Sequence, residues 1–376
     1  TELNIANGET LSGSTKIASN KTLSLSGTGT LDSALNLEGT LEAGANLTVS
    51  GAISVADNAT VSIPAAGTTL SYSGGELNVG SHTLSIAGAG TFSNVSGSPL
   101  VLNVADSILD LTGSGTISGS VRLDNGTLKS SGSPTISGDI TQNDNATIEV
   151  ASGQTLIYSG TSLNLGANEL TLSGGGTFSN TNALVLNDAD SLLSLGGILS
   201  VGDVDVTVAS NSGKGLHVTS SATLGTFDLT AVSNLDIAAS QTLGGQLNLQ
   251  TNGELIKSGL GEYTGDIALA GGKFSAADDQ VLAGTLSITA SSELRVSDNS
   301  TLTLSQAGGL PRGASTLTLS GGGTLSITNA LKLDNAASKL LLNSITVNSV
   351  NTTADSLGLK IDNNSTVTTL TISNIT

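Results

Sequence analysis

The sequence has 376 residues, of which 48 are Gly, only 11% are charged and 2% are aromatic. Twelve Lys and Arg face 30 Asp and Glu, for a net charge of −18, which disfavours binding to nucleic acid or to an anionic membrane, because both need a basic surface. Hydrophobic residues make up 37% and are spread evenly as Leu, Val, Ile and Ala, which argues against a disordered chain, because disordered chains lack apolar surface to bury.

The chain contains neither Cys nor Met. The absence of Cys excludes disulfides and thiolate metal sites, and the absence of Met leads us to expect a processed chain or an excised fragment. No apolar run approaches the roughly 18 residues of a membrane-spanning helix, and no signal peptide is recognisable at Thr1. We therefore expect that export was directed by a segment already removed.

The predicted elements are short β-strands. The first covers Leu3–Ile5, and strands over Thr22–Leu25, Ala34–Leu37 and Leu47–Val49 follow, separated by Gly, Asn, Asp and Ser. Gly and Asn adopt positive φ at low cost, which sharp corners require. No apolar stripe has a helical period over the length of a helix, which excludes strands that alternate with helices and a leucine-rich horseshoe with helical backs. The last strand is expected over Thr366–Ser373.

Internal repeats run along the chain. Leu170–Leu195 and Leu317–Leu342 lie 147 residues apart and are identical at 18 of 26 aligned positions. Further copies begin at Leu84 and, more faintly, at Leu23. Repeats of this kind predict one structural unit used many times, and therefore a stacked architecture rather than a compact one.

Along the expected strands of the two long repeats, positions that are identical in both copies alternate with positions that differ. The retained positions are Leu184, Leu186, Leu193 and Leu195, and the changed ones are Val185, which becomes Lys332, and Leu192, which becomes Lys339. Successive side chains of a strand point to opposite faces. We therefore expect the retained positions to face the interior and the changed ones to face solvent.

A second motif sets the length of the unit. It reads Asp/Asn-Asn-Ala/Ser-Thr before an aliphatic residue and begins at Asp57, Asp144, Asp298 and Asn363. Its copies are 87, 154 and 65 residues apart, close to four, seven and three units of about 21 to 22 residues, a length typical of β-solenoid coils. The 147-residue spacing of the longer repeat fits seven such units.

These features predict an all-β fold, a single right-handed parallel β-helix (β-solenoid) over residues 1–376, with about 17 coils and no capping helix. Each strand would pair with its equivalent one coil on, about 4.8 Å away, around an interior of Leu, Val, Ile and Ala. Open terminal coils would leave N–H and C=O groups unpaired. We therefore expect either a segment of a longer solenoid or end-to-end association with copies of itself.

The aromatic side chains are expected to fill the core rather than to form a platform on which a ligand stacks. Tyr72 and Tyr158, like Phe92 and Phe178, are 86 residues apart, a spacing of four coils. The other aromatic residues are Phe227, Tyr263 and Phe274.

The segment Glu254–Phe274, ELIKSGLGEYTGDIALAGGKF, resembles the passenger-associated repeat, with its Leu-x-Lys-x-Gly-x-Gly start, Tyr-x-Gly and a Gly-Gly-containing strand. It departs from that pattern because the strand normally found between Gly261 and Tyr263 is absent. The chain as a whole resembles the β-solenoid passenger domains of bacterial autotransporters and filamentous-haemagglutinin-type adhesins. The resemblance implies a surface adhesin, although the outer-membrane barrel of that family is absent from this sequence.

Residues that could carry chemistry are scattered. His82 and His217 are the only histidines, and neither has the spacing of a metal-binding pair. Three acidic pairs could serve a polysaccharide-cleaving enzyme or bind Ca²⁺, namely Asp188 with Asp190, Asp203 with Asp205, and Asp278 with Asp279. Basic residues are too few for such a site, and the calcium-binding nonapeptide is missing, so we interpret the pairs as solvent-facing corners. The Asn-x-Ser/Thr sequences at Asn20, Asn46, Asn58, Asn145 and Asn299 follow from the abundance of Asn and Thr.

We therefore predict no catalytic, cofactor-binding or metal-binding residue, no cofactor and no enzymatic activity. The expected function is that of an extracellular or bacterial cell-surface rod, structural or adhesive, as a segment of a large adhesin or a subunit of a filament. The expected partners are further copies of the chain and host or matrix glycans, without nucleic acid or a membrane span. Two alternatives stay open: a polysaccharide-active β-helix enzyme (a lyase or glycosidase) and a glycan-binding module.

Overall fold

The computed structural model describes the chain except for residues 96, 306–314, 329–330, 334–338, 354–357 and 374–376. In this described part every element is a β-strand, and the strands stack in parallel as the turns of a β-solenoid, about 16 in all. The predicted parallel β-helix is therefore confirmed. The chain divides into two compact units: unit 1 is Thr1–Leu184 with Gly196–Gly202, and unit 2 is Val185–Leu195 with Asp203–Thr376. One uninterrupted solenoid over residues 1–376 stays a prediction.

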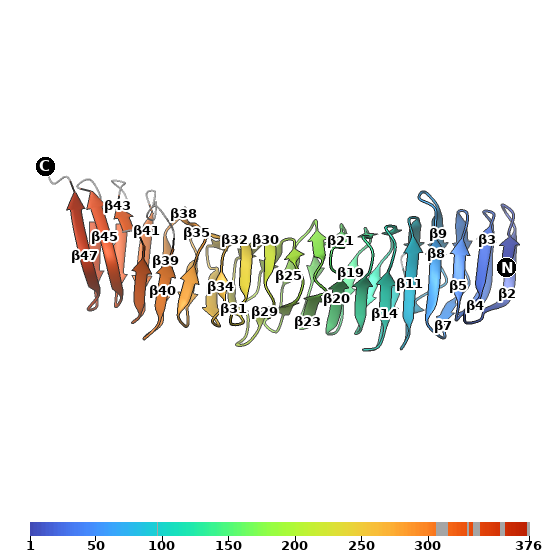
Figure 1. Cartoon of the computed structure of the whole chain (residues 1–376), viewed down its shortest axis with the longest axis horizontal. Helices are drawn as coiled ribbons and strands as arrows, with labels where there is room; N and C mark the ends of the chain where they lie inside the picture. Colours follow the sequence, from blue (N-terminus) through green and yellow to red (C-terminus); the bar gives the residue numbers. More distant parts are fainter. Residues whose placement is uncertain (96, 306–314, 329–330, 334–338, 354–357, 374–376) are drawn as a thin grey trace. The chain divides into compact units, whose positions relative to one another are not determined.

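Each turn of unit 1 has three faces, which we call first, second and third in chain order, and Figure 1 shows first-face strands such as β8, β11 and β14 following one another. The first face consists of β1 (Glu2–Asn4), β3 (Thr22–Ser26), β5 (Thr40–Ala43), β8 (Ala59–Ile63), β11 (Thr83–Gly88), β14 (Ile108–Leu111), β17 (Thr127–Ser130), β20 (Ala146–Val150) and β23 (Glu169–Ser173). The second face consists of β6 (Leu47–Val49), β9 (Thr69–Tyr72), β12 (Thr91–Asn94), β15 (Thr116–Ile117), β18 (Thr135–Ile136), β21 (Thr155–Tyr158), β24 (Thr177–Asn180) and β27 (Ser200–Val201). The third face consists of β7 (Ile53–Val55), β10 (Leu77–Asn78), β13 (Leu100–Leu102), β16 (Val121–Leu123), β19 (Ile140–Gln142) and β22 (Leu163–Asn164), while β2 (Thr10–Ile17) and β4 (Thr30–Leu37) cover the second and third faces together, and β25 (Leu184–Leu186) crosses the unit boundary.

Unit 2 repeats the same order of faces along its chain. Its first face consists of β26 (Leu192–Gly196, whose last residue belongs to unit 1), β29 (Gly215–Val218), β31 (Val232–Ile237), β33 (Glu254–Ser258), β36 (Lys273–Ala276), β39 (Ser292–Val296), β41 (Thr316–Ser320), β44 (Lys339–Asn343) and β46 (Gly358–Asp362). The second face has β34 (Glu262–Tyr263), β37 (Gln280–Leu282), β40 (Thr301–Leu304) and β42 (Thr324–Ile327), and the third has β28 (Val204–Val206), β35 (Asp266–Ala270), β38 (Leu286–Ile288) and β43 (Leu331–Leu333). The longer strands β30 (Ala222–Leu229), β32 (Thr242–Gln250), β45 (Thr346–Thr353) and β47 (Thr366–Ser373) cover the second and third faces together.

Aliphatic columns fill the interior of each unit. In unit 1 the first-face column is Leu84, Leu109, Leu128, Ile148 and Leu172, which pair in register from turn to turn and are fully buried. In unit 2 the equivalent column is Leu255, Phe274, Leu294, Leu319 and Leu342. Each such side chain contributes about 1.5–3 kcal/mol of burial free energy, so every turn is stabilised by its neighbours.

The expectation drawn from the two long repeats is confirmed at most positions. The retained Leu184, Leu186, Leu193 and Leu195 are fully buried, Val185 is half-buried and Lys339 is exposed. The expectation was wrong for Leu192, which is buried. Leu192 begins β26 at a corner, where Ser191, Leu192 and Leu193 all turn inward, so the alternation of a straight strand does not hold there. The side chains of Lys332 and Leu333 lie outside the described residues.

The coil length varies. In unit 1 Leu23 pairs with Leu41, 18 residues on, whereas Ala59 pairs with Leu84, 25 residues on. The short turn contains β4, a single strand that covers two faces and needs no corner between them. The long turn has separate strands β9 and β10, with corner residues between them. The coils therefore vary around the predicted 21 to 22 residues, and only the expectation of a near-constant length was wrong. The number of residues at the corners differs from turn to turn.

The Asp-Asn motif marks two different corners. Asp57 and Asp144 precede the first-face strands β8 and β20, four turns apart in unit 1 as predicted. Asp298 and Asn363 precede the second-face strands β40 and β47, three turns apart in unit 2 as predicted. The spacing from Asp144 to Asp298 therefore joins unlike corners, and its interpretation as seven whole coils was wrong.

Candidate functional site

At the corners, carboxylate and amide oxygens bind the backbone of the following turn. The Oδ1 atoms of Asp139, Asp203, Asp266 and Asp279 accept hydrogen bonds of 2.7–2.9 Å from the N–H groups of Thr161, Thr226, Thr285 and Thr301. Asn46, Asn58 and Asn145 accept similar bonds from Thr69, Thr83 and Glu169. Backbone N–H groups at corners need such partners, because leaving them unpaired costs free energy. Much of the acidic and Asn-rich composition thus has a structural use.

The predicted acidic pairs belong largely to this corner system. Asp188 Oδ1 accepts a hydrogen bond from the N–H of Asp190 at 3.0 Å, and Asp190 Oδ1 accepts one from Asn211 Nδ2 at 2.8 Å. Asp279 binds the next turn as described. Within the residues that the structure describes, no group of three or more His, Cys, Asp or Glu side chains could hold a metal ion.

The two residues of the pair Asp203 and Asp205 have different roles. Asp203 binds the backbone of Thr226, whereas Asp205 pairs in register with Asp228 one turn on. Asp205 and Asp228 line an open groove of about 430 Å³ on the third face of unit 2. Burial, followed by the charges of Asp228 and Asp203, raises the pKa of Asp205. Asn248 Nδ2 donates a hydrogen bond to Asp228 Oδ1 at 2.6 Å. One carboxylate oxygen of the groove is therefore already hydrogen-bonded within the protein.

The two histidines have no catalytic arrangement among the described contacts. His82 lies half-buried at the corner that precedes β11. His217 faces outward on β29, in register with Ser194 and Asp236 of the adjacent turns.

The aromatic side chains fill the core, as predicted. All seven, Tyr72, Phe92, Tyr158, Phe178, Phe227, Tyr263 and Phe274, have no exposed surface. The rings of Tyr158 and Phe178 stack with centroids 6.3 Å apart, and Tyr263 Oη donates to the carbonyl of Gly245 at 2.9 Å. None of these rings is available to stack on a ligand.

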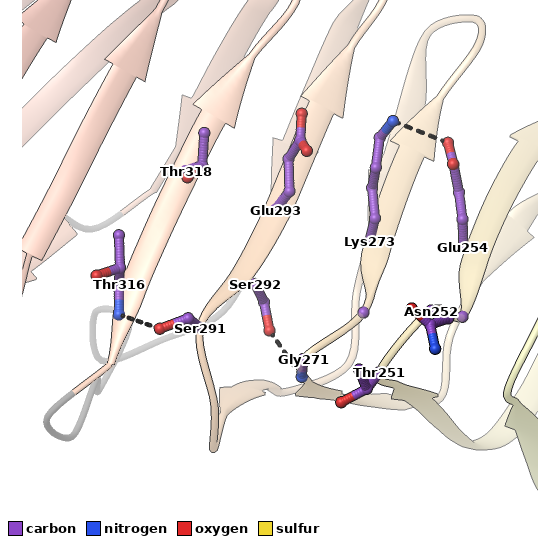
Figure 2. Close-up of a pocket in the computed structure, with 12 residues that line it drawn as sticks. Thr251, Asn252, Glu254, Gly271, Lys273, Ser291, Ser292, Glu293, Thr316 and Thr318 are labelled. Atoms are coloured by element: carbon purple, nitrogen blue, oxygen red, sulfur yellow. Dashed lines mark hydrogen bonds and ion pairs between the residues drawn. The ribbon is translucent and has the colours of Figure 1, made fainter.

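A second groove of unit 2 follows the corner between its third and first faces (Figure 2). It has a volume of about 450 Å³ and is lined by Thr, Ser, Asn and Gly backbone together with Glu254, Lys273 and Glu293. These three charges stand in register on β33, β36 and β39, and Lys273 Nζ lies 3.1 Å from Glu254 Oε1. Ser275 donates to Glu254 at 2.7 Å, and Ser320 donates to Glu293. The groove is therefore polar, with both signs of charge and with hydroxyl groups.

One charged residue lies inside the core. Lys257 on β33 points inward, because it has the same parity as the buried Leu255, and its side chain has no exposed surface. Its Nζ donates to the carbonyl of Gly261 at 2.8 Å and to Oε1 of Gln280, which is 3% exposed. Gln280 Nε2 in turn donates to the carbonyl of Gly259 at 2.9 Å. The corner Gly259–Leu260–Gly261 thus closes over a buried amine and a buried amide.

The electrostatics of Lys257 reflect this enclosure. Burial lowers the pKa of Lys257 to about 8, while the negative charges of Asp236, Asp278 and Glu262 act in the opposite direction. Sequence reasoning placed Lys257 only within a family motif and did not single it out as a site. The available signal was its parity with Leu255, the other inward position of β33, which is apolar.

Comparison with family models, with curated proteins and with solved structures finds no match for this chain. Among the described residues there is also no helix with the length and apolarity needed to span a bilayer.

Proposed function

We propose that this chain is a structural or adhesive β-solenoid of the bacterial cell surface or extracellular space, as a segment of a large adhesin or a subunit of a filament. The observation that carries the proposal is the use of corner side chains: Asp, Asn and Ser oxygens accept hydrogen bonds from the backbone of the next turn. The similarity of Glu254–Phe274 to the passenger-associated repeat supports the same assignment.

This construction suits a scaffold. The stability of stacked repeats is approximately a sum over contacts between neighbouring turns. Because those contacts are made by the buried columns, the outward side chains can differ from turn to turn without loss of the fold. Outward positions of consecutive turns stand about 4.8 Å apart, which presents a regular array of polar groups to a surface or a partner. In the filament form of the proposal, open strand edges of one copy pair with those of the next.

The groove along β33, β36 and β39 favours a glycan as the adhesive target. Its hydroxyl, amide, carboxylate and ammonium groups can donate to and accept from sugar hydroxyls, and they stand in register on successive turns. Such polar recognition fits a weak, multivalent contact, in which repeated presentation of the protein supplies avidity.

Microspheres coated with the chain test the proposal. We expect them to adhere to a subset of immobilised glycans or matrix proteins, or to one another, more strongly than spheres coated with an unrelated protein of similar acidity. Incubation with a polysaccharide panel should release no unsaturated uronate and no new reducing ends. Catalytic turnover of any polysaccharide would refute the non-enzymatic assignment, and spheres that adhere to nothing would leave only the purely structural form. Electron microscopy of concentrated protein checks the filament form, which monomers alone would exclude.

A further inference from the structure

We propose that Lys257 and Gln280 join in an intramolecular isopeptide bond, a covalent link between consecutive turns of unit 2. The proposal stands on geometry: a buried primary amine is in hydrogen-bond contact with a buried carboxamide, and the chain holds the two together from β33 and from β37 of the next turn. It is independent of the adhesive function proposed above.

The enclosure fixes both partners. The carbonyls of Gly261 and Gly259 bind Lys257 Nζ and Gln280 Nε2 respectively. Neither side chain has room to leave, because Lys257 is fully buried and Gln280 is 3% exposed. Holding two reactants in contact gives effective molarities of about 10⁵–10⁸ M in favourable cases. Amide formation that is negligible between free side chains is accelerated accordingly.

The electrostatics supply a reactive form of the amine. With its pKa lowered to about 8 by burial, Lys257 is neutral in roughly a tenth of the molecules at neutral pH, whereas an ordinary Lys is almost entirely protonated. Only the neutral amine has the lone pair that attacks a carbonyl carbon. The Nζ of Lys257 donates its hydrogen bonds to neutral oxygens, the carbonyl of Gly261 and Oε1 of Gln280, and not to a carboxylate.

The reaction balances within the chain. After the carboxamide of Gln280 turns its oxygen aside, Nζ of Lys257 forms a bond to Cδ of Gln280. The bond from Cδ to Nε2 breaks, and the proton that the amine loses is delivered to the departing nitrogen, so that one ammonia leaves. The contacts of Nζ are to Gly261 O and Gln280 Oε1, so the proton passes from the amine directly to the departing nitrogen within this enclosure.

Mass spectrometry of the full chain tests the link. We expect the purified chain, after incubation at mildly alkaline pH, to weigh less than its sequence by one ammonia. Trypsin normally cuts after Lys257 and Lys273, but an acylated Lys257 resists it. The digest should therefore contain residues 215–273 uncut and joined to residues 274–295 as one branched peptide.

Variants separate this link from other losses of ammonia, such as cyclisation at Asn-Gly. Lys257→Arg keeps the charge and Gln280→Glu keeps the shape, and each should abolish the branched peptide. Lys273→Arg alters an outward Lys of the same unit and should leave the link intact, with the branch at Lys257 unchanged. Full recovery of the separate peptides 215–257 and 258–273 from the natural chain would overturn the proposal, and Lys257 would then be a buried hydrogen-bonding amine only.

Discussion

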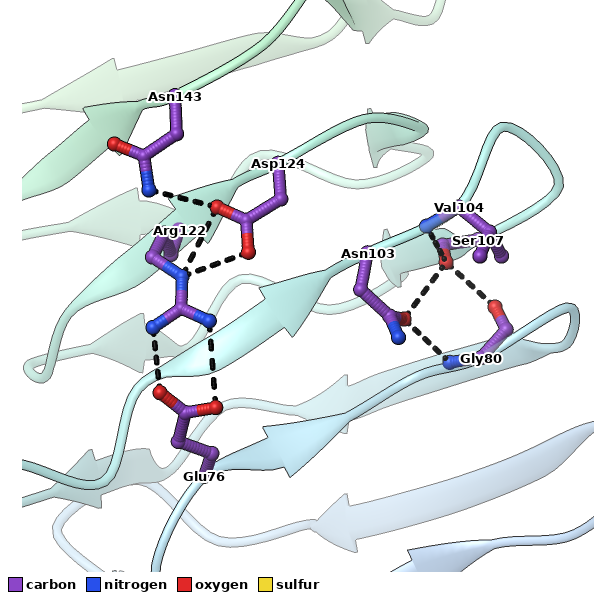
Figure 3. Close-up of polar contacts among 8 residues, drawn as sticks. All are labelled: Glu76, Gly80, Asn103, Val104, Ser107, Arg122, Asp124 and Asn143. Atoms are coloured by element: carbon purple, nitrogen blue, oxygen red, sulfur yellow. Dashed lines mark hydrogen bonds and ion pairs between the residues drawn. The ribbon is translucent and has the colours of Figure 1, made fainter.

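Arg122 binds Glu76, 46 residues earlier in the chain, across the third face of unit 1 (Figure 3). Its Nη1 lies 2.5 Å from Glu76 Oε1, and its Nη2 lies 3.3 Å from Oε2. On the other side its Nε donates to both oxygens of Asp124, and Asn143 Nδ2 donates to Asp124 Oδ1 at 2.8 Å. The guanidinium therefore connects the turns that carry β10 and β16, and Asp124 extends this network to Asn143 on the turn of β19.

Replacing Arg122 should weaken unit 1 modestly. The Arg122 side chain is 27% exposed and that of Glu76 is 45% exposed, so solvent screens much of their attraction. We expect Arg122→Met to cost about 0.5–1 kcal/mol of unfolding free energy in low salt and less in high salt. Urea unfolding at the two ionic strengths measures the difference. Lys16→Met, which breaks an ion pair whose Lys is 59% exposed, should change almost nothing. An equal loss from both variants would contradict the argument.

The corner acceptors give a sharper prediction. Asp279 Oδ1 accepts the N–H of Thr301 at 2.7 Å. Asp279→Ala leaves that N–H without its partner and should cost about 1 kcal/mol, whereas Asp279→Asn keeps an acceptor and should cost much less. Native-state hydrogen exchange at the Thr301 amide reports this directly. Unchanged protection of Thr301 in the Ala variant would show that the bond contributes nothing.

Alkaline pH should destabilise the chain through its tyrosines. Burial raises the pKa of Tyr72, Tyr158 and Tyr263 above the ordinary value of 10.0. The folded chain then keeps phenol protons that the unfolded chain releases near pH 10. Because the folded state binds more protons there, the free energy of unfolding falls as pH rises above about 10.

Tyrosinate absorbance measures this without a label, since these are the only three Tyr of the chain. The native chain should titrate at higher pH than the urea-unfolded chain. Tyr263→Phe should remove the part of the signal that titrates last. Coincident titrations of native and unfolded chains would refute the buried placement of the phenols.

The aliphatic columns should be the most sensitive positions. Leu128 is fully buried in the first-face column of unit 1, and Leu128→Ala should cost about 2–5 kcal/mol through lost burial and a residual cavity. The neighbouring Lys129 faces outward and pairs with Glu149 at 3.1 Å, so Lys129→Ala should cost less than about 1 kcal/mol. Thermal unfolding of the two variants compares them, and a larger loss from Lys129→Ala would reverse the assignment of faces.

The fold could be predicted from the sequence because the same alternation of inward and outward residues recurs in every repeat. Alternation along the retained Leu184 and Leu186 identified the interior, and both are fully buried. The prediction failed where corners intervene. Leu192 is buried because the chain turns there, and Asp144 and Asp298 share a motif that serves two unlike corners. The role of a corner residue depends on which N–H group of the next turn it binds. That partner cannot be identified from the sequence of one strand alone.

The candidate site was less predictable than the fold. The amine of Lys257 is hydrogen-bonded to the side-chain amide of Gln280, 23 residues later in the chain. This pair can be predicted only when the register between the two turns is known. The parity of Lys257 with Leu255 predicts an inward position, but an isolated Lys in an inward position is also consistent with a bulge or a strand end. The partner Gln280 begins β37 directly after a corner, where the number of residues varies from turn to turn.

Engineered cysteines test the parallel stacking of turns most directly, in a chain that has no Cys of its own. Thr60 pairs with Ser85, and Ser85 pairs with Asp110, on successive turns of unit 1. Adjacent turns place paired Cα atoms about 4.8 Å apart and two turns about 9.6 Å, whereas disulfides need about 4.4–6.8 Å. Thr60→Cys with Ser85→Cys should therefore oxidise readily to an intramolecular disulfide, and Thr60→Cys with Asp110→Cys should not. A disulfide in the second variant and none in the first would contradict the stacked-turn structure.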